Sequence, residues 1–130
     1  MTRILGIDYG TKRLGFALGD PLTGIAVPLD IIELDGRDPV EIVSRMVKED
    51  GYDQIVIGTP RTVDGEPTRM SESVDIFAKH VGAMTDVNVT LVSEHLTSKI
   101  SDQLSDEVGS RRHDDALAAM LIVQEFLNEL

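Results

Sequence analysis

The stretch "RILGIDYGTKRLGFALGD", residues 3–20, decides the fold. Its apolar run Ile4-Leu5-Gly6-Ile7 reads as a strand, yet it ends in the carboxylate Asp8, followed by Gly10 and the pair Lys12-Arg13. Aspartate is depleted in strands, and an ionised carboxylate is costly to bury without partners. Asp8 therefore requires a hydrogen-bond network, a basic partner or a cation.

The same stretch opens a predicted meander of three short strands, at residues 3–8, 13–19 and 25–34. Gly10 separates the first two, and the turn from Asp20-Pro21 to Gly24 separates the second from the third. Parallel strands need long crossovers, so this close spacing predicts antiparallel pairing.

Beyond the meander, helical and strand patterns alternate. The helical period of "VEIVSRMVKEDG" ends at Gly51, and the continuous apolar run "QIVIG" suits a buried parallel strand. The remaining predicted elements are a helix near 71–84, a strand at 87–92, a weaker helical segment at 98–108 and a long apolar helix at 113–130. The order βββαβαβαα predicts an α/β protein with a mixed five-stranded sheet and helices on both faces, and it resembles the ribonuclease H-like fold.

Length and composition favour one domain over residues 1–130, without repeats or linkers. Cysteine is absent, which excludes disulfides and thiol chemistry. Charged residues interrupt every apolar run well before membrane-spanning length, and no signal peptide is visible. These features predict a cytoplasmic protein that does not enter a membrane.

The charge balance opposes nucleic-acid binding at first sight, because 12 basic and 23 acidic residues give a net charge of −11. A local basic patch can still oppose the average. Six of the 12 basic residues fall in three predicted loops that could form a basic rim if they converge. The six candidate nucleic-acid contacts are Lys12, Arg13, Arg61, Arg69, Arg111 and Arg112.

Three carboxylates stand where predicted elements end or begin. Asp8 ends the first strand, Glu94 follows the last strand, and Asp115 lies in the first turn of the final helix. Sites in open α/β sheets form beyond the carboxyl ends of the strands. If strands one and five are parallel and close, Asp8 and Glu94 share one edge, and the small Ala118 and Ala119 let the helix bring Asp115 towards them.

Three carboxylates this close would repel one another unless a cation neutralised them. Oxygen ligands without cysteine point to Mg²⁺ or Mn²⁺ rather than zinc. Two such ions can activate water and stabilise the leaving oxygen in an in-line phosphoryl displacement. The pattern therefore predicts that Asp8, Glu94 and Asp115 are catalytic residues that hold metal, with two ions expected.

Four segments resemble the blocks of the YqgF/RuvX family of bacterial ribonuclease H-like nucleases, and together they cover essentially the whole chain. They are "GIDYGTKRLGFALGD", "VIGTP…DG", "SEHLTS" and "HDDALAAMLIVQEFL". The resemblance implies a nuclease that processes pre-16S rRNA or resolves Holliday junctions. It carries the family's acidic positions onto Asp8, Glu94 and Asp115.

The chain differs from the family pattern in three places. Ser93-Glu94-His95 stands where the family usually has Asp-Glu-Arg, which removes or weakens a basic substrate contact. Arg61-Thr62-Val63 precedes Asp64-Gly65 where a Leu-Asn type of sequence is common. The segment between Glu94 and Asp115 is short, so Arg111 or Arg112 is the candidate for the basic residue that a loop there often carries. The acidic positions are kept, and substrate preference is what these differences affect.

Each acidic residue also has a plain structural interpretation. Asp8 could close a turn, since Asp-x-Gly is common turn chemistry, and Glu94 could be an exposed residue at a strand end. Asp115 could favour the helix macrodipole with Asp114 as the N-cap, and either aspartate could then be the ligand. His95 and His113 flank these positions as possible extra ligands or proton carriers, although a solvent-facing loop is the usual place for such histidines.

Three functional classes remain open. The first is a Mg²⁺- or Mn²⁺-dependent phosphodiesterase acting on precursor rRNA or branched DNA, with a homodimer expected for a resolvase because two symmetric strands must be cut. The second is an acidic adaptor that docks on a ribosome-assembly or DNA-repair partner, which the net charge favours. The third is a nucleotide-binding module, because "DYGT" at 8–11 also matches the phosphate loop of actin-like and sugar-kinase ATPases.

Overall fold

The computed structural model describes residues 2–60, 66, 68–93 and 111–130. Its sheet has five strands in the order β3-β2-β1-β4-β5. The first three strands pair antiparallel as a meander, while β4 is parallel to β1 and β5 is parallel to β4. This confirms the predicted mixed sheet. The strands are β1 (Ile4–Tyr9), β2 (Arg13–Asp20), β3 (Ile25–Glu33), β4 (Gln54–Thr59) and β5 (Asn88–Ser93).

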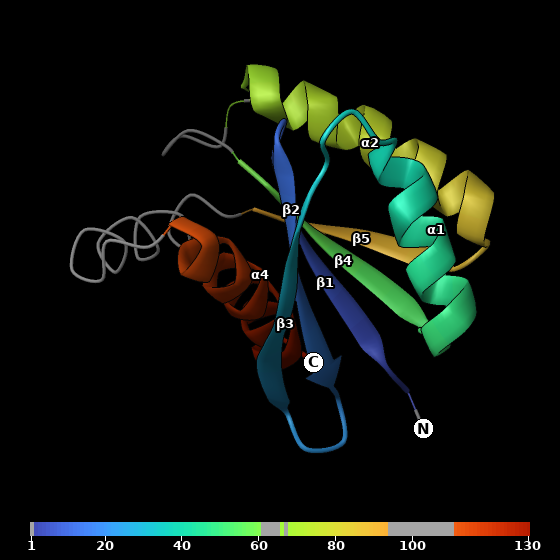
Figure 1. Cartoon of the computed structure of the whole chain (residues 1–130). Coiled ribbons are helices and arrows are strands. Elements are labelled where there is room, and N and C mark those ends of the chain that lie inside the picture. The colour runs from blue at the N-terminus through green and yellow to red at the C-terminus, as the bar shows by residue number, and fades with distance from the viewer. Residues whose placement is uncertain (1, 61–65, 67, 94–110) are drawn as a thin grey trace.

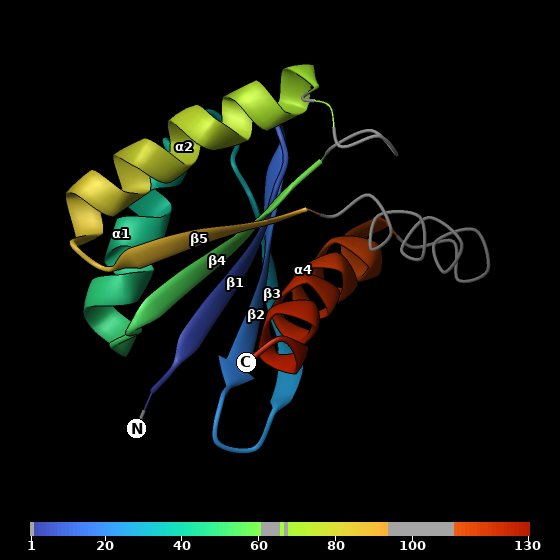
Figure 2. The ribbon, with the colours of Figure 1, turned by 180° about the vertical axis from the view of Figure 1, so that it is seen from behind.

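Helices cover both faces of the sheet, as predicted. Helices α1 (Pro39–Asp50) and α2 (Arg69–Thr85) lie together on one face, and α4 (Arg111–Asn128) crosses the other face (Figure 1). The view from behind shows α4 alone against the meander strands (Figure 2). Among the described elements, α4 therefore packs mainly on β2, β3 and β1.

Local chemistry sets the bounds of α1. The Asp38 side chain accepts a 3.0 Å hydrogen bond from the Val40 amide, and Pro39 at the first helical position has no amide hydrogen to leave unpaired. Gly51 ends the helix in the left-handed conformation at φ 73°, which glycine adopts without steric cost. The predicted stop at Gly51 is confirmed.

A capping box begins α2 two residues earlier than predicted. The Thr68 side chain accepts from the Ser71 amide at 3.1 Å, and the Ser71 hydroxyl accepts from the Thr68 amide at 2.8 Å. Asp86 ends the helix with φ 62°. Arg69, expected in a loop, is thus the first residue of α2.

The strands alternate between two apolar cores. On the α1 and α2 face, one core is built from large side chains such as Ile7, Phe16 and Phe77. On the α4 face, the second core joins Ile4, Val56 and α4 residues such as Ile122. Along β2 this alternation sets the buried Phe16 on the first face and its neighbour Gly15 on the second.

The final helix begins at Arg111 rather than at His113. The prediction that Arg111 and Arg112 lie in a loop is therefore wrong, since both are helical, and the alternative in which Asp114 is the N-cap is excluded. Asp115 is the fifth residue of the helix, beyond its first turn, so an interaction with the free amides of the helix N-terminus does not explain its position. The expected helical segment at 98–108 lies outside the described residues.

No helix within the described part of the chain is long and apolar enough to cross a membrane.

Candidate active site

Asp8 lies near the carboxyl end of β1, on the face that α4 covers. Gly6, two residues earlier, lies against α4: a Cβ there would come within 3.1 Å of the carbonyl oxygen of Ala119. Side chains in a strand alternate between faces, which places Asp8 on the same side as Gly6. Asp8 is half-buried and does have an interaction partner.

Gly15 brings Asp115 to Asp8. Gly15 is the cross-strand partner of Asp8 in the β1–β2 register, which separates their Cα atoms by about 5 Å. A Cβ atom on Gly15 would collide with the backbone carbonyl of Asp115, so no side chain fits between β2 and the start of α4. The two aspartates are therefore next to each other in the fold, although 107 positions separate them in the sequence (115 − 8).

The approach of α4 depends on small residues in both the helix and the sheet. Ala118 and Ala119 are buried, which confirms the predicted close contact of the helix at these residues. The sheet contributes Gly6 and Gly19, and a Cβ on either would collide with the side chain of Val123. Val123 is fully buried at this contact, so the glycines of β1 and β2 set how closely α4 lies on the sheet.

Arg13 supplies positive charge at this point. Its Nε atom lies 3.2 Å from Oδ2 of Asp115, and each of these side chains is 26% exposed. Arg13 and Gly15 are two residues apart in β2 and therefore point to the same face. The sequence indicated that Asp8 needs a hydrogen-bond network, a basic partner or a cation. A basic residue is present at the neighbouring carboxylate of Asp115.

Sequence reasoning identified Arg13 as a candidate phosphate contact and missed its ion pair with Asp115. The available signal was the alternation in "RLGFALGD", which puts Arg13, Gly15 and Ala17 on one face of a strand. The pattern does not show which helix covers that face, so the partner of Arg13 became visible only in the fold.

The third predicted carboxylate, Glu94, lies outside the described residues, as does Arg61. Strands one and five are parallel as expected, but β4 lies between them. Ser93, the last residue of β5, pairs with Thr59, whereas Asp8 follows the Ile7–Ile57 pair. The ends of β1 and β5 therefore share one edge of the sheet, about 10 Å apart across two strand spacings.

The remaining predicted basic contacts occupy different elements. Lys12 is exposed in the turn between β1 and β2. Arg69 is exposed at the start of α2, on the opposite face of the sheet from α4. Arg111 and Arg112 begin α4, and their side chains lie outside the description. Among the basic candidates whose side chains the structure describes, Arg13 is the one beside an aspartate, through its ion pair with Asp115.

Chemically, Asp8 and Asp115 offer carboxylate oxygens, the ligand type that Mg²⁺ and Mn²⁺ prefer. The guanidinium of Arg13 on Asp115 shows that the site accommodates positive charge. Within the described ranges no group of three or more histidine, cysteine, aspartate or glutamate residues could hold a metal, so the predicted triad that includes Glu94 stays a prediction.

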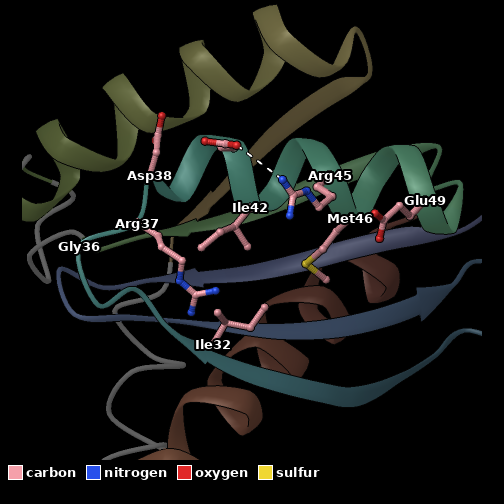
Figure 3. Close-up of a pocket in the computed structure, with 9 residues that line it drawn as sticks. Ile32, Gly36, Arg37, Asp38, Ile42, Arg45, Met46 and Glu49 are labelled. Carbon is pink, nitrogen blue, oxygen red and sulfur yellow. Dashed lines mark ion pairs between the residues drawn. The ribbon is translucent and has the colours of Figure 1, made fainter.

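A cavity of about 510 Å³ lies on the other face of the sheet, between β3 and α1, and Figure 3 shows its lining. Arg45 pairs there with Glu41 at 3.6 Å, and Arg37 donates through Nε to the carbonyl oxygen of Leu34 at 3.1 Å. None of its described lining residues is a predicted site residue. This cavity is separate from the aspartate site.

In fold, the chain is similar to structures of RuvC from Thermus thermophilus. One of them, solved in complex with a Holliday junction substrate, matches with a TM-score of 0.62 at 12% identity, covering 99% of this chain and 95% of that chain. A second RuvC structure from the same organism matches with a TM-score of 0.57 at 13% identity, covering 98% and 95%. The class of fold is therefore ribonuclease H-like, as the element order predicted.

The chain belongs to the RuvX family, whose model is described as Holliday junction resolvase and matches residues 2–129. A relative from Chlorobaculum tepidum is 34% identical over 134 residues, covering 97% of this chain and 93% of its own length. Another from Syntrophus aciditrophicus is 36% identical over 134 residues, covering 98% and 89%. Both are named as candidate pre-16S rRNA nucleases. The expected family is confirmed, and it is a family of phosphodiester-hydrolysing nucleases.

Proposed function

We propose that this chain is a Mg²⁺- or Mn²⁺-dependent nuclease that hydrolyses phosphodiester bonds in structured nucleic acid. The observation that carries the proposal is the contact of Gly15 with Asp115, which sets a second carboxylate beside Asp8 at the end of β1. Asp8, Glu94 and Asp115 would hold the cations, with two ions expected. When bound, they would generate the attacking hydroxide and stabilise the leaving oxygen.

The residues of the chain have separate tasks in this proposal. Asp8 and Asp115 present their oxygens from two rigid elements, a central strand and a packed helix, which keeps the ligand geometry fixed. The proposed contacts to the phosphate backbone are Lys12, Arg13, Arg61, Arg69, Arg111 and Arg112. Their positive charges would draw an acidic substrate to a chain of net charge −11.

Two substrates fit the family and its relatives, a four-way DNA junction and the 5′ region of precursor 16S rRNA. We favour the precursor rRNA, because the relatives from Chlorobaculum tepidum and Syntrophus aciditrophicus are both named after pre-16S rRNA and align over most of their length. Such an enzyme would work in the cytoplasm, where ribosomes are assembled. Junction resolution would instead require a homodimer, since two symmetric strands must be cut.

Cleavage of both labelled substrates, each with Mn²⁺ and with EDTA, tests the proposal. The Asp8→Asn variant should lower cleavage at least a hundredfold, because it removes a charged oxygen ligand without changing size. Asp86→Asn is the matched control: the exposed Asp86 ends α2 at φ 62°, a conformation that asparagine also tolerates. It should cleave at the rate of the unmodified protein.

Cleavage that requires the metal and Asp8 would support the nuclease, and the preferred substrate would decide between rRNA and DNA. Sedimentation analysis of the same preparations would show whether the active form is a dimer. The acidic adaptor would replace the nuclease if neither substrate is cut by pure protein in the presence of Mn²⁺. Measurable ATP affinity in place of cleavage would favour the nucleotide-binding module.

A further inference from the structure

Arg13 lies where two features of the surface meet, the Asp115 carboxylate and a hollow lined by charged residues. Its Nε atom lies 3.2 Å from the Asp115 carboxylate, on the α4 side of β2. The same residue lines a hollow of about 380 Å³ together with Thr11 and Lys12. Arg13 is thus placed between a carboxylate of the proposed metal site and an open surface hollow.

The charges around this hollow depend on the partner that Arg13 takes. The hollow is also lined by the exposed acidic residues Glu33, the cross-strand partner of Arg13, and Asp35. While Arg13 is paired with Asp115, that carboxylate offsets its charge. Glu33 and Asp35 then outweigh Lys12, so the hollow repels a phosphate group. When a cation takes over Asp115, the charge of Arg13 is no longer offset and the charges that line the hollow balance, which removes that repulsion.

A cation and Arg13 also compete for Asp115. The Oδ2 atom that forms the ion pair with Arg13 is one of the oxygens that Asp115 offers to a cation. The pair is only partly buried, so its energy is small enough for a divalent ion to displace it. Without a cation, the guanidinium offsets the repulsion between the carboxylates of Asp8 and Asp115.

We propose that Arg13 is a positioning residue that couples cation binding to nucleic-acid binding. It neutralises Asp115 until a divalent cation takes over that carboxylate, and it then pairs with a backbone phosphate of the substrate. This inference rests on the proposed function. Because coupling between two ligands is reciprocal, nucleic acid should tighten the binding of the cation as much as the cation tightens the binding of nucleic acid.

The test measures Mn²⁺ affinity by the loss of the free-ion electron paramagnetic resonance signal, with and without a four-way DNA junction, before cleavage begins and after subtraction of the Mn²⁺ that the junction binds alone. Where the cleavage assay shows that precursor rRNA is the preferred substrate, that RNA takes the place of the junction. In the unmodified protein, the junction should tighten Mn²⁺ binding roughly fivefold. Arg13→Gln should bind Mn²⁺ alone roughly fivefold more tightly than the unmodified protein, because its competitor is gone. In that variant the junction should add less than a twofold further effect.

Two variants keep the result independent of general charge and of folding. Lys79→Gln removes the same charge from an exposed position of α2, on the opposite face of the sheet from α4, and its Mn²⁺ affinity should stay within twofold of the unmodified protein. Arg13→Lys keeps the charge with a single ammonium group and should lie between Arg13→Gln and the unmodified protein. Thermal unfolding of each variant confirms that the compared proteins are folded.

A purely structural ion pair would lower the unfolding temperature of Arg13→Gln and leave its Mn²⁺ affinity unchanged or weaker, which overturns the inference. Asp115→Asn separates this failure from failure of the proposed function. If Mn²⁺ binding depends on Asp115 but not on Arg13, only the coupling is wrong. If Asp115→Asn binds Mn²⁺ as well as the unmodified protein, the proposed metal site itself is wrong and the coupling falls with it.

Discussion

The two faces of the sheet are packed by opposite means. Under α1 and α2, large side chains such as Ile7, Phe16 and Phe77 are buried and fill the space between the sheet and the helices. Under α4, the glycines of β1 and β2 let the helix backbone approach the strands closely, beside a second core that includes Ile4, Val56 and Ile122. The first arrangement gains stability from buried apolar area. In the second, glycines bury less apolar area but hold two carboxylates in place.

Phe16 and Gly15 make this comparison testable, because they are neighbours in β2 and face opposite helices. Phe16→Ala should lower the free energy of unfolding by about 3–5 kcal/mol, the usual cost of a large cavity in a core. Urea unfolding followed by circular dichroism measures the change. Where Phe16→Ala is too unstable to assay, Phe16→Leu should lose less stability and keep cleavage per folded molecule within about twofold. A hundredfold loss of cleavage in folded Phe16→Leu would show that the two faces are not separate in function.

Gly15→Ala should have the opposite profile. Its added methyl group collides with the backbone of Asp115, so the start of α4 must move away from β2. We expect a loss of about 1–3 kcal/mol in the free energy of unfolding from overpacking, and a fall in cleavage of roughly a hundredfold from misplacement of the carboxylate. Cleavage rates normalised to the folded fraction separate the two effects.

Gly82→Ala is the matched control for that substitution. Gly82 lies within α2, and an added Cβ would make only an ordinary 3.7 Å contact with Val89. Replacing a helical glycine with alanine should raise the free energy of unfolding by about 0.5–1 kcal/mol and leave cleavage unchanged. Equal losses of activity in both glycine variants would contradict the special role of Gly15.

The smallest expected effect belongs to Tyr52, on the α1 and α2 side. Burial raises the pKa of Tyr52 above its ordinary value of 10.0, with a lowering contribution from Arg3 and a raising one from Asp50. The folded state therefore favours the neutral phenol. The contribution of Tyr52 to the free energy of unfolding is complete below pH 10. It is lost as the pH rises from there through the higher pKa of Tyr52 in the folded state.

Tyr52→Phe removes this titration. Unfolding measured between pH 8 and pH 11 should show a shallower alkaline loss of stability in Tyr52→Phe than in the unmodified protein. Parallel curves for the two proteins over this range would indicate that Tyr52 ionises equally in the folded and unfolded states.

Much of the site was visible in the sequence because it depends on local rules. The apolar run before Asp8, the helical period after residue 113 and the small Ala118-Ala119 pair each indicate an element and a face. The start of α4 was misplaced by two residues, because "RRHDD" carries no marked helix-start signal beyond its aspartates. That error put Asp115 in the first turn, where the helix dipole offered a competing explanation that the structure removes.

What the sequence by itself determined is the set of elements, their order and the face on which each side chain lies, because the periods of strand and helix are local properties of the backbone. Only the tertiary structure decided that β4 separates β1 from β5, that Gly15 receives the backbone of Asp115, and that Arg13 pairs with that aspartate. The first result follows from strand pairing, and the other two depend on how α4 lies across the sheet. That position follows from the packing of residues 100 or more positions apart, which no local pattern records.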